Sequence, residues 1–237
     1  MQPLLHNRSK SSSPVTHPEC NMVFESQQMK LIIARPSPYA RKARIALLEK
    51  GLAFETVVEN PWLPDTKMPG FNPLGKVPAL VLDDGRVIHD SKVIVEYLET
   101  LNAPPALIPD SPQLRIEHKQ IEAIADGVCD AVVLVRLEGA RPKDKQSADW
   151  VARQHKKIVA GTAELSRLLG EREWFTAHGF GLADVAAGCM LGYLDFRYPE
   201  FDWRQTAPNL GRLHARLSAR PSFVQSVPQP QELPVTR

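Results

Sequence analysis

The sequence lacks the features that mark several classes of protein. It has only three cysteines, Cys20, Cys129 and Cys189, without CxxC or metal-ligand spacing, which argues against a disulfide scaffold and for a reducing, cytoplasmic location. No apolar run approaches the roughly 18 residues that span a membrane. A net charge of +2 is too small to indicate nucleic acid or an anionic membrane as a partner. We therefore expect a soluble protein with no metal, no membrane contact and no nucleic acid, and with enough length for one or two domains.

Residues 1–28 differ from the rest of the chain. They are rich in serine and proline, and they show neither apolar periodicity nor the continuous apolar core of a secretory signal. The patterned sequence begins at Met29. We predict that residues 1–28 are a disordered extension, or an artefact of start-site assignment with Met29 as the natural start; a targeting role is the minority alternative.

Residues 29–103 alternate between strand and helix patterns, and Gly51 is well placed to end the first helix. The predicted elements are strands at 30–34 and 54–58, a helix at 39–50, a hairpin at 78–88 and a helix at 90–101 with Val93, Ile94, Tyr97, Leu98 and Leu101 on one face. A strand–helix–strand unit of this length implies parallel pairing with a right-handed crossover.

Beyond a linker with four prolines between residues 102 and 112, the chain shows only helical periods. The predicted helices cover residues 113–139 (as one helix or two), 148–169, 182–193 and 210–219, and a proline-rich tail follows from residue 221. The pattern predicts a second, all-helical domain over residues 112–226.

The most informative motif is NPLGKVPAL at residues 72–80, followed by His-Asp-Ser at 89–91. Pro78 opens a strand but cannot donate a ladder hydrogen bond, which makes its peptide bond a candidate for the cis form. With Val77 bulged out, its N–H and C=O would be free to pair with an extended peptide. Asp90 and Ser91 would lie at a helix N-terminus, which favours a carboxylate. Together these residues predict a socket for a small peptide that carries a carboxylate.

These motifs resemble those of the glutathione S-transferase family, in particular its bacterial serine-type members, and the resemblance covers nearly everything after Gln28. It implies an α/β thioredoxin-like N-terminal domain followed by an all-α C-terminal domain. It also implies glutathione as co-substrate, no tightly bound cofactor and a homodimer.

The resemblance assigns a part of glutathione to each residue of the socket. Val77, held before Pro78, would pair its backbone with the cysteinyl part of glutathione. Asp90 would bind the γ-glutamyl amino group and Ser91 the γ-glutamyl carboxylate. Lys76 would reach the glycyl carboxylate, although a solvated turn lysine is an equal alternative.

Ser37 is the candidate catalytic residue, because it follows the first strand and immediately precedes a helix. A hydroxyl donor there would stabilise the thiolate of a bound ligand. The alternative is that Ser37 only caps the helix, and the two roles are compatible. Tyr39 is the second candidate donor, although a role as pocket wall is favoured. No cysteine lies near Ser37, so conjugation is favoured over disulfide exchange.

Other polar residues are expected to lie on solvent-exposed helix faces without a catalytic or binding role. Arg41, Lys42 and Arg44 are expected on a solvated helix face. Asp126 is also expected on a solvated face; the alternative is that it reaches a ligand across a dimer, as in some relatives.

Several residues are expected to be structural. Gly181 stands where relatives usually have Ser or Thr, so half of a capping box is missing, and Asp184→Ala should cost about 0.5–2 kcal/mol if the cap forms. Cys129 and Cys189 are expected as buried small hydrophobes. The four tryptophans are expected to be packing residues.

The sequence therefore predicts an enzyme that binds glutathione, stabilises its thiolate near Ser37 and adds it to a small hydrophobic electrophile, in detoxification. Tyr39, Trp62 and residues 128–135 are expected to line the electrophile pocket between the domains. Two alternatives remain open: a glutathione-dependent peroxidase or isomerase on the same fold, and a non-catalytic binding or regulatory protein.

Overall fold

The structure is a computed structural model that describes residues 29–231, and the predicted extension at residues 1–28 lies outside them. A four-stranded mixed sheet forms the first half of the described chain, with strand order β2-β1-β3-β4. The strands are β1 (Met29–Ile33), β2 (Phe54–Val58), β3 (Ala79–Val81) and β4 (Val87–Ile88). β1 pairs with β2 in parallel and with β3 antiparallel, and β3 pairs antiparallel with β4. The predicted parallel unit and hairpin are both present.

Two helices pack against this sheet, α1 (Pro38–Glu49) and α2 (Ser91–Thr100). Buried apolar side chains from β1, β3 and both helices form their shared core, including Leu31, Leu47, Leu80, Ile94 and Leu98. Glycine at position 51 allows the chain to leave α1 at a φ of +62°. The prediction that Val93 belongs to the apolar face of α2 is wrong, because its side chain is 50% exposed.

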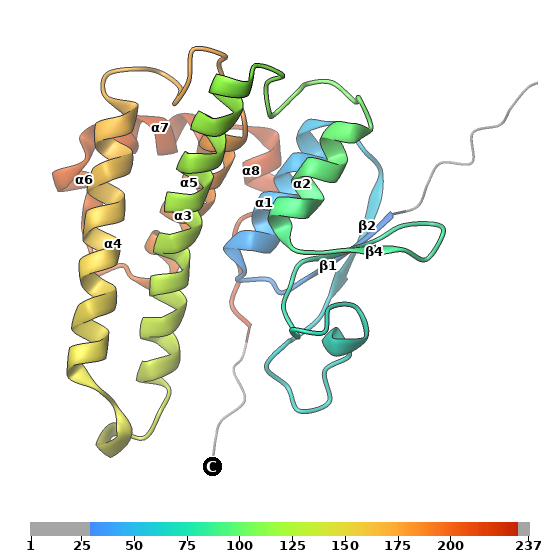
Figure 1. Cartoon of the computed structure of the whole chain (residues 1–237). Coiled ribbons are helices and arrows are strands. Elements are labelled where there is room, and N and C mark those ends of the chain that lie inside the picture. Colours follow the sequence, from blue (N-terminus) through green and yellow to red (C-terminus); the bar gives the residue numbers. More distant parts are fainter. Residues whose placement is uncertain (1–28, 232–237) are drawn as a thin grey trace, which may run out of the picture.

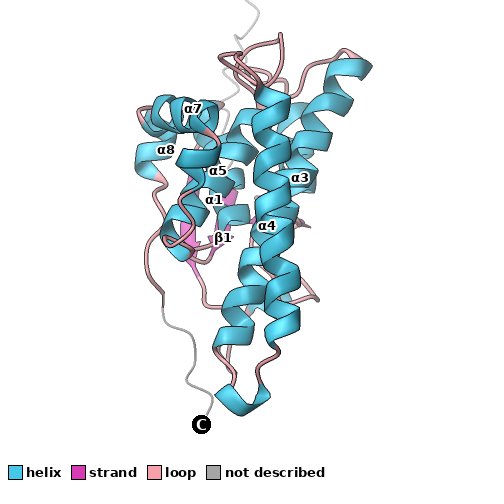
Figure 2. Cartoon of the chain, turned by 90° about the vertical axis from the view of Figure 1, so that its left-hand side faces the viewer, coloured by secondary structure: helices cyan, strands magenta, loops and turns pink. Residues whose placement is uncertain are grey.

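The second half is helical, apart from its connecting loops. Its longer helices are α3 (Pro112–Gly139), α4 (Ala148–Leu169), α5 (Leu182–Arg197) and α7 (Pro208–Ser218), and its shorter ones are η2 (Lys143–Lys145), α6 (Trp203–Thr206) and α8 (Pro221–Gln225). η1 (Met68–Gly70) lies in the first half. Figures 1 and 2 show α3 and α4 side by side, next to the sheet domain and its two helices. The predicted class, an α/β thioredoxin-like domain followed by an all-α domain, is confirmed.

Three details of the helical half differ from the prediction or refine it. α3 is one continuous helix. The tail expected from Pro221 begins with a short helix, α8, whose Phe223 is buried against the core. Trp203 is a packing residue, but Trp62 and Trp150 are 47% and 40% exposed, so the prediction fails for these two. The predicted domain limits, 29–103 and 112–226, stay predictions. No helix within residues 29–231 is both long and apolar enough to cross a bilayer.

The N-terminus of α5 is capped by groups from other parts of the chain. A Cβ at Gly181 would lie 2.5 Å from the His118 ring and 2.7 Å from the Leu107 carbonyl oxygen, so serine or threonine does not fit there. In place of a capping hydroxyl, His118 Nδ1 accepts the Ala183 N–H (3.1 Å) and the Leu107 carbonyl accepts the Leu182 N–H (2.8 Å). His118 therefore performs the role that the missing side chain would have.

Because Nδ1 accepts a hydrogen bond, His118 must stay neutral, and its Nε2 donates to Thr176 Oγ1 at 3.0 Å. Burial, with a smaller contribution from nearby His178, lowers the pKa of His118 to about 4. An unfolded histidine takes up its proton near pH 6.5, so between pH 6.5 and 4 the unfolded state binds more protons. We expect the free energy of unfolding to fall by about 2 kcal/mol more between pH 7 and 5 in the wild type than in His118→Asn. Urea titrations of both proteins at the two pH values test this, and equal losses would contradict it.

Candidate functional site

A cavity of about 740 Å³ lies between the sheet domain and the helical half. Its walls come from the N-terminal ends of α1 and α2, from the loop before β3, and from one face of α3 and the end of α5. All six residues predicted for the site line this one cavity: Ser37, Lys76, Val77, Pro78, Asp90 and Ser91. The chain thus brings together residues that lie up to 54 positions apart in the sequence, from Ser37 to Ser91.

Ser37 is the N-cap of α1, and its Oγ accepts the N–H of Ala40 at 3.2 Å. Oγ makes no other hydrogen bond within residues 29–231, so its own proton remains free to donate into the cavity. The hydroxyl also lies at the positive end of the α1 dipole. Capping and donation are therefore compatible at this residue, because they use different atoms of the hydroxyl.

Tyr39 lies in the same wall, but its hydroxyl is engaged. It donates a short hydrogen bond to Asp130 on α3. Burial and the neighbouring Cys129 and Asp130 raise the pKa of Tyr39 well above its usual range, so the phenol keeps its proton. The geometry thus favours Tyr39 as a wall that is tied to α3 and leaves Ser37 as the free donor.

The loop before β3 is shaped by Asn72, a residue given no role from the sequence. Its buried side chain donates to the Lys76 carbonyl (2.9 Å) and accepts the Leu74 N–H (3.0 Å), while Gly75 supplies a φ of +63°. The Val77–Pro78 peptide bond is cis. The N–H and C=O of Val77 make no hydrogen bond within the described residues, so both are free to pair with a ligand.

The start of α2 forms the opposite wall. Asp90 is the N-cap, and its carboxylate accepts the Lys92 N–H at 3.0 Å. Ser91 is buried from bulk solvent but lines the cavity. Lys92 reaches across the wall, with its Nζ 3.5 Å from the Asp126 carboxylate on α3. This corner holds one exposed carboxylate, one hydroxyl and the positive end of a helix, an arrangement suited to both charges of an amino acid.

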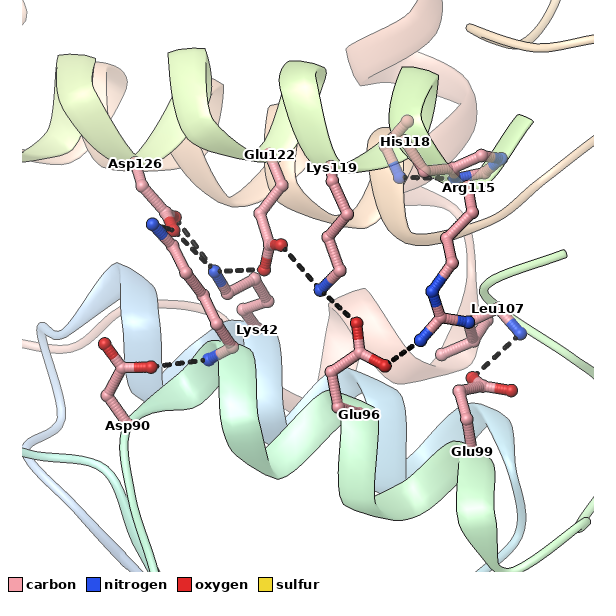
Figure 3. Close-up of polar contacts among 12 residues, drawn as sticks. Lys42, Asp90, Glu96, Glu99, Leu107, Arg115, His118, Lys119, Glu122 and Asp126 are labelled. Atoms are coloured by element: carbon pink, nitrogen blue, oxygen red, sulfur yellow. Dashed lines mark hydrogen bonds and ion pairs between the residues drawn. The ribbon is translucent and has the colours of Figure 1, made fainter. Parts of the chain in front are cut away.

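A buried ion cluster connects this corner to α1 (Figure 3). Lys42 is 1% exposed, and its Nζ lies 2.8 Å from Glu122 Oε1 and 2.8 Å from Asp126 Oδ2. Lys119 joins Glu122 at 3.1 Å and Glu96 on α2 at 2.9 Å. The predictions that Lys42 and Asp126 lie on solvated faces are therefore wrong. Arg41 is buried too, and its guanidinium donates to the Phe223 carbonyl at 3.3 Å.

The cluster controls the protonation of its own members. Burial alone would lower the pKa of Lys42, but the carboxylates of Asp126 and Glu122 outweigh it and raise that pKa. Burial alone would raise the pKa of Glu122, but Lys42 and Lys119 outweigh it and lower that pKa. For Asp126, burial dominates and the pKa is raised despite Lys42. One buried lysine therefore holds two carboxylates, and Asp126 is the one that takes up a proton more readily.

The α3 wall differs in detail from the expected lining of residues 128–135. Val128 and Val132 are buried in the helical core. The cavity-facing residues of α3 are Asp126, Asp130, Val133, Arg136 and Leu137, of which Asp130 and Val133 lie within the expected range. Apart from the adjacent Arg136 and Leu137, successive members of this set lie three or four positions apart, which marks one helix face and is a signal that the sequence contains. The side chains of Tyr193 and Arg197 on α5 complete this wall, and only the fold could show that they reach the cavity.

No cysteine of residues 29–231 lines the cavity. Cys129 and Cys189 are buried in the helical core, as predicted, and burial raises the pKa of both thiols. Cys20 lies outside the described residues. Among residues 29–231, no group of three or more His, Cys, Asp or Glu side chains could hold a metal ion.

Two family models match the chain. The glutathione S-transferase N-terminal domain matches residues 36–101, and the glutathione S-transferase C-terminal domain matches residues 148–216. An uncharacterised GST-like protein of Escherichia coli, YibF, is 39% identical over 206 residues, which are 84% of this chain and 98% of that protein.

Solved structures of similar proteins carry glutathione or an analogue. A glutathione S-transferase from Methylobacterium radiotolerans in complex with glutathione sulfonate is 49% identical, with a TM-score of 0.84 over 86% of this chain and 97% of that one. One from Methylobacillus flagellatus with bound glutathione is 40% identical, with a TM-score of 0.83 over 85% of this chain and 100% of that one.

Proposed function

The chain belongs to the glutathione S-transferase family, and we propose that it binds glutathione in the cavity and adds the glutathione sulfur to a small electrophile. One observation carries the proposal: three features line the same cavity. They are the free hydroxyl of Ser37 at the start of α1, the Val77 N–H and C=O without hydrogen-bond partners among the described residues, and the N-terminus of α2. The glutathione carried by similar structures supports it.

Each part of glutathione has a partner in this proposal. The Val77 N–H and C=O pair with the cysteinyl backbone. The cis Val77–Pro78 peptide bond is part of the same ligand-facing segment of backbone. Ser91 and the N-terminal N–H groups of α2 bind the γ-glutamyl carboxylate, and Asp90 binds the γ-glutamyl ammonium. Lys76, exposed at the cavity rim, binds the glycyl carboxylate.

Ser37 acts on the sulfur. Its O–H donates to the thiolate, and the α1 dipole adds to the stabilisation, so the thiol loses its proton to solvent at a lower pH. The thiolate then attacks the electrophilic carbon and forms a C–S bond. The electron pair displaced from that carbon leaves with a leaving group or is protonated by water. No covalent bond to the enzyme is needed, in keeping with a serine at this position.

The test compares Ser37→Ala with Ser147→Ala. Ser147 is the N-cap of α4, and its Oγ accepts the Trp150 N–H at 3.2 Å, outside the cavity. Both substitutions remove a helix N-cap, and each should lower the free energy of unfolding by about 1 kcal/mol. Only Ser37→Ala should raise the pKa of the bound thiol, by about 1 to 2, because a charge-assisted hydrogen bond is lost. Ultraviolet absorbance of the thiolate during glutathione titrations measures this pKa.

Three outcomes separate the alternatives. An unchanged thiol pKa in Ser37→Ala would move the donor role to Tyr39. Glutathione binding with turnover of a peroxide or an isomerisable substrate, and no conjugation, would favour a peroxidase or isomerase. No glutathione binding at all would leave a non-catalytic member of the family. The cytoplasmic location, the homodimer and the role in detoxification stay predictions.

A further inference from the structure

The far end of the cavity carries two arginines that the proposed reaction does not use. Arg136 lies near the C-terminus of α3 and Arg197 is the last residue of α5, and both line the cavity. Val133 on α3 and Tyr193 on α5 precede these arginines by about one helical turn and line the same cavity, and the Arg197 guanidinium donates a hydrogen bond to the Tyr193 hydroxyl. A cavity that received only apolar molecules would have little reason to hold two guanidinium groups.

Neither guanidinium has a carboxylate partner. Within residues 29–231, Arg136 and Arg197 form no ion pair, whereas Arg115, Arg204 and Arg220 each hold an acid within 3 Å. Arg197 is packed over the Phe196 ring at 4.2 Å, and its Nε is buried without a hydrogen-bond partner. Burial and the like charge of Arg136 lower the pKa of Arg197. A buried donor beside a second cation is costly unless an anion binds there.

The nearby acids do not neutralise this pair. Asp130 lines the cavity, but it accepts the hydroxyl of Tyr39 and lies six residues before Arg136 on α3. Glu200 lines an adjoining groove beside both arginines and forms no ion pair with either in the described chain. Two cations therefore face the cavity with their charge uncompensated.

The charges along α3 are ordered. The cavity face of this helix starts with Asp126 and Asp130, continues with Val133 and ends with Arg136 and Leu137, and Arg136 lies about 15 Å from Asp126 along the axis. Asp126 lies beside the start of α2, where the ammonium of glutathione is placed in the proposed function. The basic end therefore lies away from that ammonium, where the second substrate would enter.

We propose that Arg136 and Arg197 bind a carboxylate of the electrophilic substrate. This inference rests on the proposed function, and it changes the expected hydrophobic electrophile into one with an apolar reactive part and an anionic end. The planar guanidinium fork matches a carboxylate in two parallel hydrogen bonds, and Val133 and Leu137, which line the same cavity, contact the carbon chain.

The test uses two product analogues that differ only at the end of the S-substituent, S-(2-carboxyethyl)glutathione and S-propylglutathione. The second is called the neutral analogue because its S-substituent carries no charge. The variants are Arg136→Met, Arg197→Met and Arg197→Lys. Arg153→Met is the matched control, because Arg153 is an exposed arginine of α4 outside the cavity. Calorimetric titration gives Kd for each pair, and thermal melting shows which variants fold. If Arg197→Met does not fold, Arg197→Lys and Arg136→Met still test the inference.

We expect Arg136→Met and Arg197→Met to weaken binding of the carboxylate analogue by about 10- to 100-fold and to leave that of the neutral analogue unchanged. Arg197→Lys should lose part of the affinity, and Arg153→Met none. Equal weakening of both analogues, or of neither, would overturn the inference while glutathione binding upholds the proposed function. If glutathione itself does not bind the wild type, the proposed function fails and the inference fails with it.

Discussion

Replacing Lys42 with methionine should lower the free energy of unfolding by about 3–5 kcal/mol. Lys42 is 1% exposed and is the only cation within 3 Å of both Glu122 and Asp126 among the described residues. Methionine fills a similar volume but removes the one buried cation shared by both carboxylates. Glu122 keeps only Lys119 at 3.1 Å and Asp126 only Lys92 at 3.5 Å, so the buried negative charge is no longer balanced. Chemical denaturation at neutral pH measures the loss.

Two further variants make this result specific. Lys30→Met removes an exposed lysine paired with Glu55 at 3.4 Å, and should cost at most about 1 kcal/mol. In the double variant Lys42→Met, Glu122→Met, only Asp126 remains, and Lys92 lies 3.5 Å from it. The double variant should therefore be more stable than Lys42→Met alone. If Lys42→Met costs no more than Lys30→Met, the buried cluster does not stabilise the fold.

The cluster also explains why part of the sequence interpretation failed. Arg41 and Lys42 occur in a run of basic residues on a short helix, and such a run normally lies in water. Here α1 is covered on one side by the sheet and on another by α5 and α8. The acids that neutralise Lys42 follow it by 80 and 84 positions, so no local pattern could pair them.

The features that were predictable are those encoded locally. Val77, Pro78, Asp90 and Ser91 lie within 15 positions, and their turn and cap chemistry is visible in the sequence. Arg197 shows the opposite case: its role depends on how the end of α5 lies against α3, which only tertiary packing determines. Gly181 is a third case, because the hydrogen-bond acceptor that a Ser or Thr hydroxyl would provide there is replaced by the Nδ1 atom of His118 from another helix.

Replacing Asp184 with alanine should lower the free energy of unfolding by about 2–5 kcal/mol, the second of the two largest effects expected for this protein. Asp184 is fully buried, and its carboxylate accepts two backbone N–H groups, from Gly181 and from Phe175, both at 3.0 Å. Alanine leaves both donors buried without a partner, and each costs about 1–3 kcal/mol. The loss exceeds the 0.5–2 kcal/mol expected from a cap alone, because the second bond fixes the Phe175 segment against α5.

The ionisation of the Asp184 carboxylate determines the pH at which stability should be measured. Burial raises the pKa of Asp184 to about 6, against the two N–H donors that lower it, so stability should be compared at pH 7.5, where the group is ionised. Asp149→Ala is the matched control, since Asp149 is an exposed acid in the first turn of α4 and should cost about 0.3–1 kcal/mol. Asp184→Asn retains one acceptor oxygen, so its loss of unfolding free energy should lie between those of Asp149→Ala and Asp184→Ala.

Because Asp184 lies outside the cavity, the folded fraction of Asp184→Ala should bind glutathione with wild-type affinity. A weakened affinity in folded protein would show instead that the α5 cap also positions the site. A loss of stability no larger than that of Asp149→Ala would mean that the two buried N–H groups find other partners.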